Sequence, residues 1–331
     1  MPASVWRRIR ARLRPLRARA TAASSRATDL VKRVAGRVAK RVASARGGLR
    51  ILVRPRGADE RDVRSLMLRH AFSRSTLLGD QPRVSLTSYG WRLDTVHLAI
   101  ESIGRGSARP RTLTLWLEAP PTGRIRRRLR RLERRGLRVR LTEGYGPHTK
   151  YYPEIRLPGG TESPLVTADD DMVYPPDWLR QLDSAARDEP ELIHCHRAHR
   201  VLATDDAIAP YTEWTPVADR TPRLGNLATG VSGVIYPPRV LRALAARGTD
   251  FRDASPTADD IWIHATAVEE GIATRQLSRS ARLFPAVPGT QVYGLYAHNV
   301  VGGANDAQVA ASYSAAAVAQ LAAESEAERD A

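Results

Sequence analysis

The sequence has little of several features that would place it in a specialised class. Among its 331 residues there is one cysteine, Cys195, so no disulfide can form within the chain, and a reducing compartment is favoured. No apolar run approaches the roughly 20 residues that a membrane-spanning helix needs. No apolar segment follows the N-terminal charges as it does in a secretion signal. The sequence therefore predicts neither a disulfide-stabilised secreted protein nor an integral membrane protein.

Acidic residues are almost absent from the first 56 residues, which contain 17 Lys and Arg and a single acid, Asp29. The whole chain has 52 basic and 35 acidic residues, so subtraction leaves 35 basic and 34 acidic residues for the remainder. The net charge of +17 therefore belongs to the N-terminal segment, and the body of the protein is nearly neutral. A neutral body without a recognised nucleic-acid motif argues against a nucleic-acid-binding protein.

Part of the basic segment has the pattern of an amphipathic helix. Between residues 30 and 43, apolar side chains recur at helical spacing, and most of the Lys and Arg side chains fall on the other side. Such a helix lies on anionic lipid headgroups. We therefore expect a basic tail, residues 1–56, that docks a cytoplasmic protein peripherally on the inner face of a membrane. A disordered solubilising arm, a nucleic-acid arm and an organelle transit peptide share this composition and stay open.

From Gln81 onward, short apolar runs alternate with longer helical patterns, which predicts βαβ units and an α/β fold with a mostly parallel sheet. The expected strands are residues 83–88, 112–117, 137–141, 164–168 and 192–196. The expected helices are residues 94–104, 125–135, 257–270 and an alanine-rich helix from about residue 305. We expect one domain over residues 80–310, followed by a C-terminal helix and tail over residues 305–331.

Three consecutive carboxylates, Asp169, Asp170 and Asp171, follow an apolar strand. The carboxyl ends of parallel strands form the edge at which open α/β sheets bind ligands. Successive side chains of a strand alternate, so we expect Asp169 and Asp171 to point to one side and Asp170 to the other. Neighbouring carboxylates repel one another unless a cation lies between them, and Mg²⁺ or Mn²⁺ suits oxygen ligands of this kind. The alternative is an acidic turn that caps the helix beginning near Pro176.

The aspartate run resembles the D-x-D motif of GT-A glycosyltransferases, and the surrounding sequence is similar to bacterial family-2-like transferases of polysaccharide clusters. The segments that carry this resemblance, in order, are residues 84–89, 147–152, 169–175, 197–199, 229–238, 256–262 and 302–306. The resemblance implies a GT-A fold of mixed, mostly parallel sheet. It implies metal-dependent, inverting transfer of a sugar from a nucleotide diphosphate to a hydroxyl of a glycan or lipid-linked acceptor.

The same resemblance implies roles for individual residues. Those expected to bind the nucleotide sugar are Thr87, Ser88, Tyr89, Arg92, Lys150, Asp170, Gly230 and Gly233. Asp169 and Asp171 are the expected ligands of Mn²⁺ or Mg²⁺, with His298 as a weaker third ligand. Inversion requires a base that takes the proton of the acceptor hydroxyl, and Asp260 is expected to be that base, with Asp259 as the fallback.

Each of these roles has a structural alternative. Thr257 is a good helix N-cap, and Asp259 and Asp260 would then be acids that favour the first turn of a helix. Lys150 would be a solvated lysine on a helix surface. A metal-dependent phosphohydrolase would use the same aspartate cluster, but it would release phosphate or a nucleoside monophosphate instead of a nucleoside diphosphate.

Overall fold

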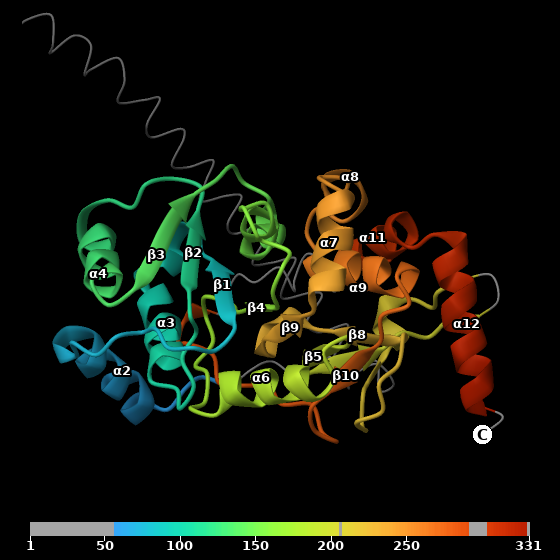
Figure 1. Ribbon diagram of the computed structural model, residues 1–331, viewed down its shortest axis with the longest axis horizontal. Coiled ribbons are helices and arrows are strands. Elements are labelled where there is room, and N and C mark those ends of the chain that lie inside the picture. Colours follow the sequence, from blue (N-terminus) through green and yellow to red (C-terminus); the bar gives the residue numbers. More distant parts are fainter. Residues whose placement is uncertain (1–55, 205–206, 291–302, 330–331) are drawn as a thin grey trace, which may run out of the picture. The chain divides into compact units, whose positions relative to one another are not determined.

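The structure is a computed structural model that describes residues 56–204, 207–290 and 303–329 (Figure 1). The chain divides into two units, Met1–Leu49 and Arg50–Ala331. The amphipathic helix predicted for residues 30–43 lies outside the described residues, and the predicted domain start at residue 80 falls inside the second unit. None of the helices formed by the described residues has the length and hydropathy that a membrane-spanning helix requires.

A seven-stranded sheet forms the centre of the second unit, with the order β10-β5-β9-β4-β1-β2-β3 (Figure 1). Its strands are β1 Arg83–Thr87, β2 Leu113–Leu117, β3 Leu137–Leu141, β4 Leu165–Thr167, β5 Ile193–Cys195, β9 Val234–Tyr236 and β10 Thr274–Gln276. All neighbouring strands are parallel except β9, which is antiparallel to both β4 and β5. The predicted mixed, mostly parallel sheet is therefore confirmed.

A second, three-stranded antiparallel sheet has the order β7-β6-β8 and was not predicted. Its strands are β6 Ala198–Arg200, β7 Thr215–Pro216 and β8 Asn226–Ala228. Strands of two or three residues are too short to show a hydrophobic period, so they are defined by their partners and not by a local pattern.

Helices flank the main sheet. The α-helices are α2 Glu60–Phe72, α3 Val96–Gly104, α4 Gly123–Glu133, α5 Tyr152–Ile155, α6 Trp178–Asp188, α7 Pro238–Ala246, α8 Phe251–Ala254, α9 Asp259–Glu269, α11 Ala304–Ser312 and α12 Ala315–Arg329. The 3-10 turns are η1 Gly90–Asp94, η2 Gly146–Lys150, η3 Tyr211–Glu213 and η4 Gly230–Ser232. The expected single C-terminal helix is two helices, because the chain is extended at Tyr313.

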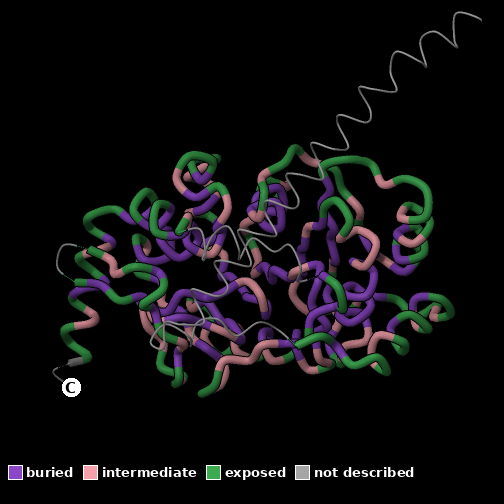
Figure 2. The backbone as a smooth tube through the Cα atoms, turned by 180° about the vertical axis from the view of Figure 1, so that it is seen from behind, coloured by how far each residue is buried: buried purple, intermediate pink, exposed green. Residues whose placement is uncertain are grey.

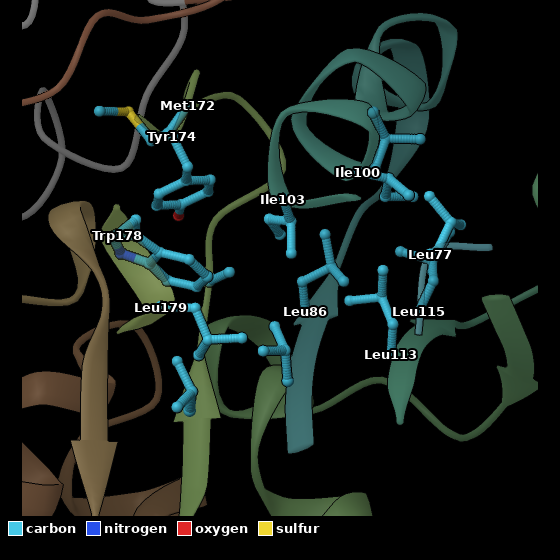
Figure 3. Packing of buried hydrophobic residues seen from close by; sticks show 14 of the residues in the cluster. Leu77, Leu86, Ile100, Ile103, Leu113, Leu115, Met172, Tyr174, Trp178 and Leu179 are labelled. Carbon is cyan, nitrogen blue, oxygen red and sulfur yellow. The ribbon is translucent and has the colours of Figure 1, made fainter. Parts of the chain in front are cut away.

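The main core lies between the sheet and its helices. Buried residues gather in the interior and exposed residues on the outer turns (Figure 2). Leu86 of β1 and Leu113 and Leu115 of β2 pack against Ile100 and Ile103 of α3 (Figure 3). All five residues of β2 are buried, as expected for a strand covered on both faces. The same cluster extends to side chains that follow the aspartate run, namely Met172, Tyr174 and Trp178 (Figure 3). The loop that carries the aspartates is thus anchored in the core immediately after them.

Candidate functional site

The carboxyl ends of β1 and β4 lie side by side. The two strands are parallel, with Ser85 opposite Thr167, so the residues that follow them emerge at the same edge of the sheet. Ser88 donates a hydrogen bond from its hydroxyl to Oδ2 of Asp170 over 2.5 Å. This contact joins two residues that the sequence assigned to the donor site.

Arg92 of η1 contacts two of the three aspartates. Its Nη1 lies 2.8 Å from Oδ1 of Asp170 and 3.0 Å from Oδ2 of Asp171. Burial raises the pKa of Asp171 to about 7, with Asp169 and Asp170 adding to the increase, although the positive charge of Arg92 opposes it. One guanidinium, that of Arg92, therefore faces two carboxylates after the end of β4.

The expected alternation of the three aspartates is wrong. Strand β4 ends at Thr167, and Asp170 and Asp171 lie in a turn, where side chains no longer alternate. As a result Asp170 and Asp171 share Arg92, whereas Asp169 faces Lys150. Strand geometry thus does not place Asp169 and Asp171 on a common face. A ligand shared by the two carboxylates would depend on the conformation of the turn that carries them.

Lys150 links the aspartate run to helix α9. Its ammonium nitrogen lies 3.1 Å from Oδ1 of Asp169 and 3.1 Å from Oδ2 of Asp259. Burial opposes the charge on Lys150, but Asp169 and Asp259 outweigh it and hold its pKa well above the usual value. The side chain is buried, so Lys150 is not the solvated lysine of the alternative interpretation. A Cβ atom at Gly230 would lie 3.0 Å from the ammonium nitrogen, which gives this glycine a direct relation to the site.

Helix α9 begins with the two acids Asp259 and Asp260, but its N-cap differs from the one expected. The N-cap residue is Ala258 and makes no side-chain cap. Thr257 instead donates its N–H and its hydroxyl to Oε1 of Gln308 on α11, over 2.8 and 3.1 Å. The first turn of α9 is therefore fixed by α11, and the threonine does not cap it.

Asp259 and Asp260 have different surroundings. Asp259 is buried and forms the ion pair with Lys150, whereas Asp260 is partly exposed and its Oδ1 accepts the N–H of Ile261 over 3.0 Å. Burial, followed by the charge of Asp259, raises the pKa of Asp260 to about 7. A carboxylate that titrates near neutral pH and is reachable from solvent is suited to accept a proton.

Of the three remaining predicted donor residues, Gly233 and Thr87 have structural contacts and Tyr89 is exposed. Gly233 has φ +88°, and a Cβ atom there would lie 2.6 Å from the ring of Trp178, so packing alone requires a glycine. The Thr87 hydroxyl donates to the carbonyl of Trp116, which commits it to the neighbouring strand. Tyr89 is 50% exposed, at the start of the loop that leads to Arg92.

Two residues near the site were not assigned a role from the sequence. Trp91 is 44% exposed, and the Arg92 guanidinium lies 5.8 Å from its ring centre and 5.8 Å from that of Tyr89. The signal was present as an aromatic pair in the loop after the first strand. Arg197 donates to the Thr229 hydroxyl over 3.0 Å, and burial lowers its pKa, while Tyr211 and Asp260 act in the opposite direction. Its proximity to Asp260 required the tertiary structure.

Oxygen chemistry at this edge of the sheet fits a hard divalent cation. The described residues contain no group of three or more His, Cys, Asp or Glu side chains gathered as metal ligands, and His298 lies outside the described residues. Mg²⁺ in phosphate-handling sites is, however, usually held by one or two carboxylates together with substrate phosphates. The side chain of Asp169 is 24% exposed and that of Asp171 is 7% exposed, so Asp169 is the more accessible candidate ligand.

Comparison with known proteins gives a distant likeness in fold. No protein-family model matches the chain, and no curated protein sequence matches it significantly. Among solved structures it is similar to GalNAc-T7 with UDP, GalNAc and Mn²⁺, at 10% identity over 74% of this chain and 56% of that chain, with TM-score 0.44. It is also similar to a mannosyltransferase from Pyrobaculum calidifontis with GDP-Man and Mn²⁺, at 15% identity over 82% and 83% of the chains, with TM-score 0.40.

A third similar structure is the inositol-1-phosphate CTP transferase from T. maritima, at 11% identity over 68% and 97% of the chains, with TM-score 0.36. All three TM-scores lie below 0.5, and the chain spans little more than half of the GalNAc-T7 chain. The activities of these enzymes therefore do not transfer to this protein, and its function has to be argued from its own residues. What the chain shows by itself is a mixed α/β protein with an acidic, cation-bridged cluster at the carboxyl edge of its sheet.

Proposed function

We propose that the protein is a metal-dependent GT-A glycosyltransferase that transfers a sugar, with inversion, from a nucleotide diphosphate to an acceptor hydroxyl. The observation that supports this most is the bridge from Asp169 through Lys150 to Asp259. It brings the aspartates expected to bind metal next to the acids expected to supply the base. These two motifs are far apart in the sequence, and a shared site is what the reaction requires.

In this proposal the cations of the site bind the diphosphate. Lys150 and Arg92 already neutralise carboxylates, and both lie at the edge where the donor phosphates would be placed. When bound at Asp169 and Asp171, Mg²⁺ or Mn²⁺ supplies Lewis-acid stabilisation of the departing diphosphate. Tyr89 and Trp91 offer exposed aromatic faces for the nucleoside, and Ser88 and Asp170 hold the adjacent loop in place.

Asp260 is the proposed base. Asp259 is engaged by Lys150, so its negative charge serves as a counter-ion, whereas Asp260 is partly exposed and has a pKa raised to about 7. Attack of the acceptor hydroxyl on the anomeric carbon forms the new C–O bond and breaks the bond to the diphosphate. The hydroxyl proton passes to the Asp260 carboxylate. The acceptor would therefore bind on the exposed side of the first turn of α9.

The acceptor class and location belong to the same proposal. The basic tail would hold the enzyme at the inner face of an anionic membrane, which suits a glycan or a lipid-linked acceptor. The remaining chain has 35 basic and 34 acidic residues and is therefore nearly neutral. For this reason we do not propose nucleic acid as a partner.

The test is a thermal-shift screen of UDP, GDP, CDP, ADP and dTDP with and without Mn²⁺, followed by turnover of the corresponding sugar nucleotides. A transferase is stabilised by one nucleoside diphosphate in a metal-dependent way and releases that diphosphate from the sugar nucleotide. Release of inorganic phosphate or a nucleoside monophosphate as the first product would support the phosphohydrolase alternative. Absence of any metal-dependent nucleotide response would contradict both.

A further inference from the structure

Helix α2 exposes an unusual amount of apolar side chain. Phe72 is 77% exposed, Met67 53% and Leu68 51%, and all three lie in the second half of one helix. The buried side of α2 is formed by Leu66 and His70, so the helix already has a core-facing side. Single exposed apolar residues are common on protein surfaces, but three within six residues of one helix indicate a surface that contacts something.

Helix α4 presents the opposite property, a face of arginines. The exposed arginines of this helix and its C-cap are Arg124, Arg126, Arg127, Arg130, Arg131 and Arg134. Leu129 and Leu132 are buried on the other side of the helix. Within the described part of the chain, Arg126, Arg127, Arg130 and Arg134 make no ion pair. Like charges at i, i+4 destabilise a helix, so this face gains from an anionic partner.

The two helices are held next to each other. Arg131 of α4 donates from Nη1 to the carbonyl of Ala71 over 2.7 Å and to that of His70 over 3.3 Å, at the end of α2 that carries Phe72. Behind them the buried carboxylate of Glu101 on α3 accepts from Arg135 and pairs with Arg69 of α2 over 3.1 Å. Arg131 therefore holds the apolar end of α2 against the arginine-rich helix α4.

We propose that Met67, Leu68 and Phe72 of α2, together with the arginine face of α4, form a docking surface for an anionic lipid bilayer. Apolar side chains enter the boundary between headgroups and acyl chains, and neighbouring arginines bind the anionic headgroups. A nucleic acid would use the arginines but has little use for exposed Met67 and Leu68 on a helix. The basic segment of residues 1–56 ends only four residues before α2 begins at Glu60, so a tail held on lipid delivers this surface to the same membrane.

The surface is a second contact, separate from the tail, and a position-specific probe tests it in the full-length chain. Ala71→Cys places a thiol on the exposed side of α2 without altering the three apolar residues, and Ala319→Cys places the control on the exposed side of α12. Burial raises the pKa of the native Cys195 thiol to about 12, so an environment-sensitive maleimide dye reacts at the introduced position. The labelled proteins are mixed with phosphatidylcholine vesicles with and without phosphatidylserine, and with brominated lipids.

The dye at position 71 should shift to the blue and be quenched by brominated lipid only when phosphatidylserine is present, while the dye at position 319 should not respond. Full-length Met67→Gln/Leu68→Gln/Phe72→Ser should bind these vesicles at least about tenfold more weakly. Arg130→Gln/Arg134→Gln should weaken binding by roughly tenfold or more, whereas Arg156→Gln/Arg242→Gln, which removes two exposed arginines elsewhere, should have a smaller effect. Melting temperatures of all variants identify any that fail to fold.

Equal responses of the two labels, or vesicle binding unchanged by the apolar triple substitution, would overturn the proposal even if the tail binds lipid. A response of the position-71 dye to duplex DNA or to an acidic polypeptide, with none to anionic vesicles, would also overturn it and reassign the surface.

Discussion

The ammonium nitrogen of Lys150 lies 3.1 Å from Oδ2 of Asp259 and joins the η2 turn to the first turn of α9. Because Asp259 is the buried partner of a lysine, the two consecutive acids of α9 are not equivalent. Asp259 supplies charge balance, and Asp260 is the acid in the first turn that is partly open to solvent. This difference turns the choice of catalytic base into a testable one.

Asp260→Asn should lower turnover by roughly 10²–10⁴-fold while donor affinity stays nearly unchanged, because the amide keeps the shape but cannot accept the proton. Its melting temperature should not fall, since an asparagine side-chain oxygen can still accept the Ile261 N–H. The measurements are turnover, donor affinity and melting temperature. Normal turnover in a folded Asp260→Asn protein would remove it as the base.

Asp259→Asn is the matched control at the neighbouring position. It should reduce turnover less but stability more, by roughly 1.5–3 kcal/mol, because it weakens a charged hydrogen bond to the buried Lys150. A large loss of turnover in Asp259→Asn alone would move the role of the base by one residue. A loss in neither would favour a retaining mechanism.

The pH dependence should follow Asp260. Its folded-state pKa is raised to about 7, chiefly by burial, so its contribution to stability is complete below the unfolded pKa and is lost as the pH rises through about 7. The base must be ionised, so kcat/KM should rise toward a plateau above about pH 7. As the pH is raised to 8, chemical unfolding should show that Asp260→Asn loses less stability than the unmodified protein. The loss that remains is expected from Asp171, whose pKa is also raised to about 7. If the residual activity of Asp260→Asn still falls at low pH with the same midpoint, the titration belongs to another group.

Asp169→Asn should abolish the Mn²⁺-dependent part of nucleoside diphosphate binding, and the fold should persist, because Asp259 still neutralises the buried Lys150. Asp171→Asn should also reduce the metal response, and it should disturb Arg92 as well, whose Nη1 lies 3.0 Å from the Asp171 carboxylate. Thermal shifts with UDP and GDP over a series of Mn²⁺ concentrations distinguish the two variants. An unchanged metal response in the double variant would place the metal elsewhere.

The two glycines after β8 should respond differently to alanine. Gly233→Ala should cost on the order of 1–3 kcal/mol or more of stability, because the backbone has φ +88° and ψ 140° and the new Cβ would lie 2.6 Å from the Trp178 ring. Gly230→Ala should cost less stability but weaken donor binding, since its Cβ would lie 3.0 Å from the Lys150 ammonium. Unfolding curves and donor titrations of both variants test this. Equal stability losses with unaffected donor binding would argue against a role for Gly230 near the donor.

Deletion of residues 1–56 should sharply lower affinity for anionic vesicles, because each basic residue near such a surface contributes about 1 kcal/mol. Activity on a soluble acceptor analogue should survive, since all the proposed site residues lie between Thr87 and Asp260 within the described chain, His298 excepted. Vesicle co-sedimentation and turnover of both forms provide the test. Equal sedimentation of both forms would show that the tail is not a membrane anchor.

The sequence alone predicted the strands and helices of the site that have a periodic pattern. The apolar runs that include Val84 and Leu86, and Leu113 and Leu115, predicted strands. The structure places β1 and β2 within one residue of the expected bounds. Helix α3 was also predicted, because Val96, Ile100 and Ile103 recur at helical spacing. Such patterns are local, because the residues that face the core recur at a fixed spacing along the chain.

The geometry of the site was decided only by the tertiary structure. No pattern in the sequence shows that Lys150 lies between Asp169 and Asp259, or that Thr257 contacts Gln308 instead of capping α9. The aspartate alternation failed because β4 stops at Thr167, and strand length is set by pairing with β1 and β9. The sequence supplies the charged groups and the strand that leads to them. Which charge meets which depends on contacts between distant segments, because an ion pair is stabilised by proximity in space and leaves no periodic trace along the chain.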